Sequence, residues 1–176
     1  MKTFRGVASE KELAPPAEIQ ARVLKSLDST GLPYEVVKID PAFADTAQFC
    51  ANYGFPPEQS ANTIIVATKK TPRQFTASVV RATVRLNVNH CVKRLMGNQR
   101  VSFADAEDTV ALTGMMIGGV TALALPEEVQ VFVDPGLMDL DYIILGAGSR
   151  SAKIKVSPEV FNHIPNALVV ENLVIA

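Results

Sequence analysis

The spacing of apolar positions predicts a helix near the start of the chain, followed by alternating strands and helices. Apolar residues recur at near-helical intervals over 17–27, after two prolines and before Gly31, which is typical of a helix and its stop. A strand is expected over 34–39. Asp45 and Gln48 form a capping pair, which predicts a second helix ending near Gly54.

Two adjoining strands are predicted in the middle of the chain. A β-branched run over 62–68 indicates a buried strand, and a turn separates it from a second strand over 74–84. The two-residue period of an extended chain would place Arg81 and Arg85 on one face of that second strand.

Short helices are expected next. Asn87 or Asn89 can cap a helix that runs to Gly97, and Ser102 with Asp105 resembles the cap of an acidic helix.

The last third of the chain is predicted to be mostly strand. Ser157 and Pro158 open a short helix, and strands are expected over 129–133, 142–145, 152–156 and 167–175. Strands outnumber helices and their connections are short, which favours mixed, largely antiparallel pairing. We therefore expect one α/β (α+β) domain over 17–176, with a mixed sheet flanked by helices, and an N-terminal extension over 1–16.

Composition supports a packed core and gives no sign of secretion. Hydrophobic residues make up 48% of the chain, and two cysteines, Cys50 and Cys91, are too few for a disulfide framework. The first residues carry several charges and no signal-like apolar stretch, and nowhere do ~18 apolar residues run together. These features favour a cytoplasmic protein without a membrane segment.

Charge is strongly segregated along the sequence, although the net charge is only −1. Residues 69–100 contain eight Lys and Arg residues and no acid, whereas residues 101–149 contain eight Asp and Glu residues and no Lys or Arg. One interpretation is a basic face that binds a polyanion such as tRNA. The other is that the two blocks pair with each other in the fold. The candidate tRNA-binding residues are Lys69, Lys70, Arg73, Arg81 and Arg85.

The segment 112–121 has an unusual glycine content. Three glycines within six positions do not suit a regular helix or strand, so we predict a tight loop whose exposed amides can hold a carbonyl or phosphate. The segment lacks the patterns of a Walker loop and of a dinucleotide-binding loop. A close-packing loop without chemistry is the alternative.

Four motifs resemble, in order and spacing, the YbaK/EbsC family of tRNA-editing domains, which includes the insertion domain of bacterial prolyl-tRNA synthetase. They are Leu112-Thr113-Gly114, Gly118-Gly119-Val120-Thr121, Val131-Phe132-Val133-Asp134 and Gly146-Ala147-Gly148-Ser149-Arg150. The resemblance covers roughly residues 17–172. It implies an aminoacyl-tRNA deacylase that hydrolyses the ester of a mischarged tRNA.

The resemblance also implies a site without a metal or other cofactor, in which the glycine loop holds the aminoacyl carbonyl and a ribose hydroxyl of the substrate assists the attack. On this basis the catalytic residues are Asn62, Gly118 and Gly119, and the substrate-binding residues are Thr63, Val120, Thr121, Gly146, Gly148 and Lys153. The implied partner is aminoacyl-tRNA, and an aminoacyl-tRNA synthetase is a further candidate. Neither membrane nor DNA is expected.

Departures from the family pattern leave two functions open. The position where the family carries a pocket lysine is Asn62, which brings no positive charge. Ala124 stands where glycine is usual. Lys153 follows Ala152 where an acid is common, and it is either a substitute for the missing lysine or a solvated surface residue. The chain is then either a deacylase with altered rate or substrate, or a non-catalytic module that binds an aminoacyl group, a small molecule or tRNA.

Other reactive side chains give weaker signals. Neighbouring His90 and Cys91 would diverge on a helix, and no set of residues has metal-site spacing. Asp134 either caps the next turn or faces the pocket. For the glycine loop, we expect Gly119→Val to abolish function and to leave folding intact.

Overall fold

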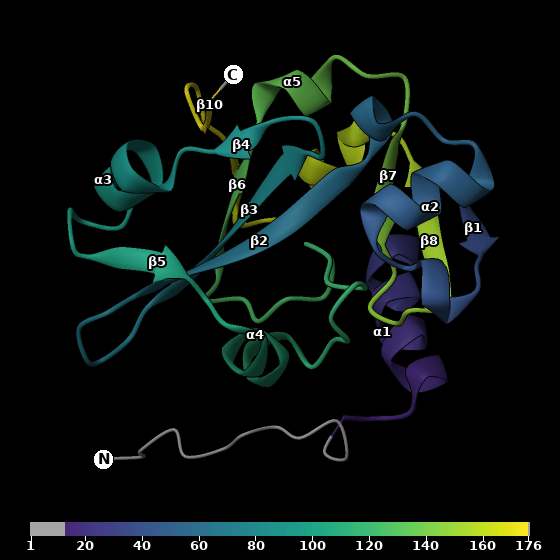
Figure 1. The fold of residues 1–176 in the computed structure, drawn as a ribbon, viewed down its shortest axis with the longest axis horizontal. Coiled ribbons are helices and arrows are strands. Elements are labelled where there is room, and N and C mark those ends of the chain that lie inside the picture. Colours follow the sequence, from purple (N-terminus) through teal and green to yellow (C-terminus); the bar gives the residue numbers. More distant parts are fainter. Residues whose placement is uncertain (1–12, 176) are drawn as a thin grey trace.

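A five-stranded mixed sheet forms the centre of the structure (Figure 1). In the computed structural model, which describes residues 13–175, β5 pairs antiparallel with β2 and β2 antiparallel with β3. The pairs β3–β6 and β6–β9 are parallel. The strands lie in the order β5 (Val101–Phe103), β2 (Ala61–Thr68), β3 (Phe75–Arg81), β6 (Gln130–Val133) and β9 (Ala167–Val169).

A second, antiparallel sheet adjoins the first. Its strands are β1 (Tyr34–Lys38), β8 (Ala152–Val156) and β7 (Ile143–Gly146), with β8 in the middle. A single parallel bridge between Ser60 and Ile144 joins the two sheets. Two further short strands, β4 (Arg85–Leu86) and β10 (Val174–Ile175), pair with each other. The prediction of mixed, largely antiparallel pairing is confirmed, although the strands form three sheets rather than one.

Helices cover both sheets (Figure 1). The prediction of a helix over 17–27 is confirmed by α1 (Pro16–Asp28), which buries Ile19, Val23 and Leu27. The other helices and helical turns are η2 (Pro41–Phe43), α2 (Thr46–Tyr53), η3 (Pro57–Gln59), the π-helical turn η4 (Val88–Val92), α3 (Lys93–Leu95), α4 (Ala106–Thr113), α5 (Pro135–Met138) and η5 (Pro158–His163).

The two faces of the five-stranded sheet bury different clusters. Ile65, Val79 and Val131 belong to the main core, which also includes the buried side of α1. Val66 and Val80 face the other way and pack in a second cluster with residues of η4. This division follows the two-residue period of a strand. A third cluster, around Phe49 of α2, adjoins β7.

Three predicted elements differ from the structure. Ser102 lies in β5, and the cap of α4 is Asp105, whose carboxylate accepts a 2.8 Å hydrogen bond from the Asp108 amide. The strand expected over 74–84 ends at Arg81, so Arg81 and Arg85 belong to different sheets. The strand expected over 167–175 is divided into β9 and β10 by a turn in which Asn172 has a φ of 60°.

The N-terminal extension predicted over 1–16 falls largely outside the described residues, which begin at residue 13. Among the helices that the structure describes, none is long and apolar enough to cross a membrane.

The predicted glycine loop packs its backbone against the backbone that follows β7. The Gly148 amide donates a 2.7 Å hydrogen bond to the Gly119 carbonyl, and the Met116 amide donates a 2.9 Å bond to the Gly148 carbonyl. A Cβ on Gly119 would lie 2.3 Å from the Ser149 carbonyl oxygen. Packing therefore favours glycine at position 119, and we now expect Gly119→Val to destabilise the fold rather than to leave folding intact.

We predict that Gly119→Ala lowers the free energy of unfolding by about 1–3 kcal/mol, because the new Cβ meets backbone atoms that cannot move independently. Urea denaturation measures this change. The control is Gly54→Asn, since Gly54 has a φ of 75° and no atom within 4 Å of an added Cβ, and asparagine tolerates that backbone. Equal stability of Gly119→Ala and the wild type would contradict the packing argument.

Candidate functional site

A cleft of about 320 Å³ opens between β2, α2, the glycine loop and the β7–β8 pair. Six of the predicted site residues line it: Asn62, Thr63, Gly118, Val120, Gly146 and Lys153. Sequence reasoning did not assign the other lining residues, which include Asp45, Thr46, Phe49, Phe103 and Ile117. The cleft thus brings together residues from segments that are more than a hundred positions apart, such as Asp45 and Lys153.

The cleft lies along an edge of β2 that no strand within residues 13–175 covers. On this side β5 pairs with β2 only over Val66–Thr68. Toward the start of β2, the next backbone pairing is the bridge between Ser60 and Ile144 of β7, so Thr63 lies between the two. The carbonyl of Ile65 accepts from Ala104 on the β5 side, and residues two apart in a strand point their backbone groups to the same side. The N–H and C=O of Thr63 therefore point into the gap.

Thr63 adds a further polar group. Its hydroxyl oxygen is buried and has no hydrogen-bond partner within the described part of the chain. Unpartnered buried polar groups are costly and are often found where a ligand or water binds. Thr63 therefore offers a donor, an acceptor and a hydroxyl at one point of the cleft.

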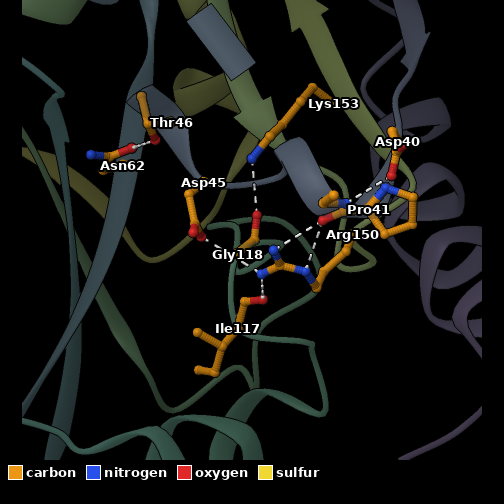
Figure 2. Close-up of polar contacts among 10 residues, drawn as sticks. Asp40, Pro41, Asp45, Thr46, Asn62, Ile117, Gly118, Arg150 and Lys153 are labelled. Carbon is orange, nitrogen blue, oxygen red and sulfur yellow. Dashed lines mark hydrogen bonds and ion pairs between the residues drawn. The ribbon is translucent and has the colours of Figure 1, made fainter. Parts of the chain in front are cut away.

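Lys153 brings a buried positive charge to the cleft (Figure 2). It extends from β8, is only 7% exposed, and its Nζ donates a 2.9 Å hydrogen bond to the carbonyl of Gly118. The ammonium also lies 5.9 Å from the centre of the Phe49 ring. Burial lowers the Lys153 pKa to about 8, and the positive charge of Arg150 adds to this effect. Burial excludes the interpretation of Lys153 as a solvated surface residue.

Arg150 fixes the position of the glycine loop (Figure 2). Its guanidinium donates a 2.7 Å hydrogen bond to the Ile117 carbonyl and two bonds, of 3.0 and 3.2 Å, to the Pro41 carbonyl. The Asp45 carboxylate lies 3.6 Å away and supplies the opposite charge. Asp45 is at the N-cap of α2, as predicted, but its side chain makes no cap hydrogen bond.

Asn62 is already engaged with α2. Its side-chain oxygen accepts a 2.9 Å hydrogen bond from the Thr46 hydroxyl (Figure 2). The amide nitrogen of Asn62 therefore remains as the donor that this residue can offer to a ligand. No charge comes from this position, so Lys153 is the ammonium that lines the cleft.

Three of the residues predicted to be catalytic or to bind the substrate do not line the cleft. Gly119 packs against Gly148 and Ser149 as described above, and a Cβ on Gly148 would meet Ile19 of α1 at 2.8 Å. The Thr121 side chain is fully buried. These residues support the walls of the site rather than contact its interior.

One of the loop amides predicted to face a ligand, that of Gly119, is engaged within the loop. Gly118 turns its carbonyl toward Lys153, and the Gly119 amide donates to the Met116 carbonyl at 2.8 Å. The Gly119 carbonyl points to Gly148, so the Val120 amide of the same peptide points the opposite way. Val120 lines the cleft and is the better candidate for an exposed amide donor.

The basic residues proposed for tRNA binding are divided by the fold. Arg73 pairs with Asp108 at 2.6 Å, and Arg81 pairs with the buried Asp134 at 3.1 Å. Asp134 also caps α5 by accepting from the Gly136 amide. Arg85 is exposed on β4, in a different sheet. Pairing between the basic and acidic blocks thus accounts for Arg73 and Arg81, and the exposed Lys69 and Lys70 remain together in the β2–β3 turn.

One site residue that was not predicted from the sequence, Arg150, lay within a family-like motif, whereas others had no such signal. Arg150 stood at the end of a quoted motif, but its role as an anchor depends on Pro41, more than a hundred residues away. Phe103 and Ile117 gave no signal, because their exposure at the cleft follows from how β5 ends and the loop turns. Among the described residues, no cluster of His, Cys, Asp or Glu could hold a metal ion.

The structure is that of an α+β domain in which a cleft lies between an open strand edge and a glycine loop. The sequence model of the aminoacyl-tRNA editing domain family matches residues 40–163. The chain belongs to this family.

Solved structures share the fold. The hypothetical protein APE2540 superposes with a TM-score of 0.74 at 28% identity, over 84% of this chain and 96% of that one. A candidate trans-editing enzyme for prolyl-tRNA synthetase gives a TM-score of 0.74 at 21% identity, over 90% and 96% of the two chains. The fold also matches 31% of a candidate signal transduction protein from Marinobacter aquaeolei VT8, with a TM-score of 0.59 at 13% identity over 93% of this chain.

We predict that Lys153→Met changes how stability depends on pH. Folding lowers the Lys153 pKa from 10.5 to about 8, so the native state binds the proton less tightly than the unfolded state. The free energy of unfolding should therefore rise by up to about 3 kcal/mol as pH increases from about 8 to 10.5. This gain is lost when pH falls back to about 8, and below that pH both states are protonated. The variant should lose this rise.

Urea titrations of the wild type and of Lys153→Met across this pH range give the difference in their free energies of unfolding. The contributions of the other titrating groups cancel in this difference. The matched control is Lys155→Met, because Lys155 is on the same strand but is half-buried and outside the cleft. Identical pH dependence of the wild type and Lys153→Met would show that the Lys153 ammonium is not desolvated.

Proposed function

We propose that the protein is an aminoacyl-tRNA deacylase, which hydrolyses the ester between a wrong amino acid and the 3′ end of tRNA in the cleft of Thr63 and Lys153. Family membership supports the editing role. The observation that carries the proposal is the buried Lys153 ammonium, 2.9 Å from the Gly118 carbonyl and opposite an unpaired strand edge. Aminoacyl-tRNA is the substrate, and a synthetase that makes the error is a candidate partner.

The residues around the cleft match the groups of an aminoacyl ester. The α-ammonium of the amino acid requires an acceptor, which the Thr63 carbonyl supplies, and the ester carbonyl requires donors. The Lys153 ammonium has three donors and spends one on Gly118, so two remain for the substrate. The Val120 amide is a further donor. Donors held in place before the reaction stabilise the negative charge that develops on the ester oxygen.

The reaction requires a water molecule and no cofactor. Water attacks the ester carbon, the bond to the ribose oxygen breaks, and a proton passes to that oxygen, which leaves a free amino acid and an intact tRNA. A ribose hydroxyl of the substrate assists the attack, as the family resemblance implies. Because the ester is already reactive, positioning and charge stabilisation supply most of the acceleration.

A binding module without hydrolysis is the second candidate. It is favoured by Asn62, which is neutral and whose side-chain oxygen is held by Thr46. In this case the same cleft would hold the aminoacyl group without stabilising the transition state. Incubation with a panel of aminoacyl-tRNAs, with ester loss as the readout, separates the two functions.

We predict that Lys153→Met lowers the rate of ester hydrolysis about ten- to a hundred-fold, which corresponds to one charge-assisted hydrogen bond of ~1.5–3 kcal/mol. The double variant Asn62→Lys with Lys153→Met moves the cation from β8 to β2, its family position, and should restore hydrolysis or change the amino acid removed. Single-turnover assays with mischarged tRNA measure both effects.

Lys155→Met is again the matched control and should keep the wild-type rate, since Lys155 packs over Tyr142 and does not line the cleft. A wild type that hydrolyses no member of the panel would favour the binding module. A wild type that hydrolyses rapidly, with Lys153→Met unchanged, would remove Lys153 from the mechanism.

We predict a distinctive pH dependence of kcat/KM. If the charged ammonium is the active form, the enzymatic rate falls as pH rises through about 8, the pKa of Lys153. Spontaneous ester hydrolysis rises with pH and is subtracted with a protein-free control. The Lys153→Met variant should lack the descending limb. A rate that rises through the same pH would instead make neutral Lys153 a general base.

A further inference from the structure

Two large apolar side chains stand exposed at the cleft. Phe103 is 60% exposed and Ile117 is 45% exposed, although both line the cleft. The other large exposed apolar residues of the described chain, Leu168, Val169 and Ile175, lie on β9 and β10, away from it. An aromatic ring held in solvent beside a polar cleft is unfavourable unless a ligand covers it.

Exposed cations lie near the start of β5, although an offset of three residues puts the side chains of Arg100 and Phe103 on opposite faces of the strand. Phe103 is the last residue of the strand, and Arg100 directly precedes its first residue, at about 10 Å for a rise of ~3.3 Å per residue. The Lys69 amide donates a 2.9 Å hydrogen bond to the Arg100 carbonyl, which places the β2–β3 turn beside Arg100. Arg100, Lys69 and Lys70 are exposed, and no ion pair among residues 13–175 involves them.

We propose that Phe103 is a stacking platform for the terminal adenine of tRNA, with Arg100, Lys69 and Lys70 in contact with the phosphates that precede it. This inference rests on the proposed substrate. The scissile ester is attached to the terminal ribose, so an ester inside the cleft leaves the attached base at the cleft mouth. Aromatic stacking combined with a cationic groove is the usual way in which proteins hold single-stranded nucleic acid.

The geometry favours this occupant over a second copy of the chain. β5 is an edge strand of only three residues, and short edge strands flanked by charge resist pairing with another sheet. The cations near Phe103 suit a phosphate backbone and would repel the same surface on another copy. Arg73 is the other basic residue of the β2–β3 turn. It forms an ion pair with Asp108, so it is not one of the cations assigned to the phosphates.

Binding of uncharged RNA tests the platform without any hydrolysis. The probe is a short single-stranded RNA ending in CCA, compared with the same RNA lacking the terminal adenine base. Phe103→Ala should weaken binding of the complete RNA about five- to a hundred-fold, and Phe103→Trp should retain it. The two RNAs should bind Phe103→Ala equally. Isothermal titration calorimetry gives the dissociation constants.

The matched control is Leu168→Ala, because Leu168 is a large residue, 52% exposed, on the opposite edge strand of the same sheet. It should bind as the wild type does. In addition, Arg100→Gln should reduce the salt dependence of binding by about one counterion. Sedimentation of each variant shows whether the mutation acts through self-association.

Each outcome separates this inference from the proposed hydrolysis. RNA binding that depends on Phe103 and on the terminal base, without cleavage of any aminoacyl-tRNA, would support the platform and contradict the deacylase. Cleavage of aminoacyl-tRNA with unchanged kcat/KM in Phe103→Ala would overturn the platform and leave the deacylase standing. Equal losses in Phe103→Ala and Leu168→Ala, or a change in oligomeric state alone, would also overturn the platform.

Discussion

The contact of backbone against backbone between the glycine loop and the segment after β7 is the constraint on which the site depends. The Gly148 amide bonds the Gly119 carbonyl at 2.7 Å, and a side chain on either Gly119 or Gly146 would meet backbone atoms within 2.6 Å. This close approach joins the β7–β8 pair to the loop that faces the five-stranded sheet. It sets the Gly118 carbonyl in front of Lys153, and Arg150 holds the loop there through the Ile117 carbonyl.

The same arrangement creates a cleft with two contrasting walls. One wall is the edge of β2 at Thr63, which is left uncovered because β5 pairs only with the end of β2. The other wall carries the desolvated Lys153 ammonium, whose burial costs stability. Burying a charge without a full ion pair is unfavourable for folding alone, which is typical of sites where function constrains the sequence.

The charge pattern of the sequence divides between folding and binding. Arg73 and Arg81 join basic and acidic segments that are far apart in the chain, and Asp134 serves as both a cap and an ion-pair partner. Three exposed cations, Lys69, Lys70 and Arg100, lie where the β2–β3 turn meets the start of β5, whereas Arg85 and Arg94 are exposed elsewhere. Ala124, where the family has glycine, adopts a φ of 57°, a left-handed backbone that costs a residue with a side chain roughly 1–2 kcal/mol.

Local patterns in the amino-acid sequence were enough to predict α1, most strands, the mixed pairing and the family, because helix periodicity, β-branched runs and motif spacing depend on near neighbours. They also brought Asn62, Gly118 and Lys153 into one candidate pocket through the resemblance. The tertiary structure alone decided that Gly119 and Gly148 are packing residues, that Arg81 is neutralised, and that Phe103 is exposed at the cleft. Each of these depends on which distant segments approach, and on a few ångströms of backbone separation that no local pattern encodes.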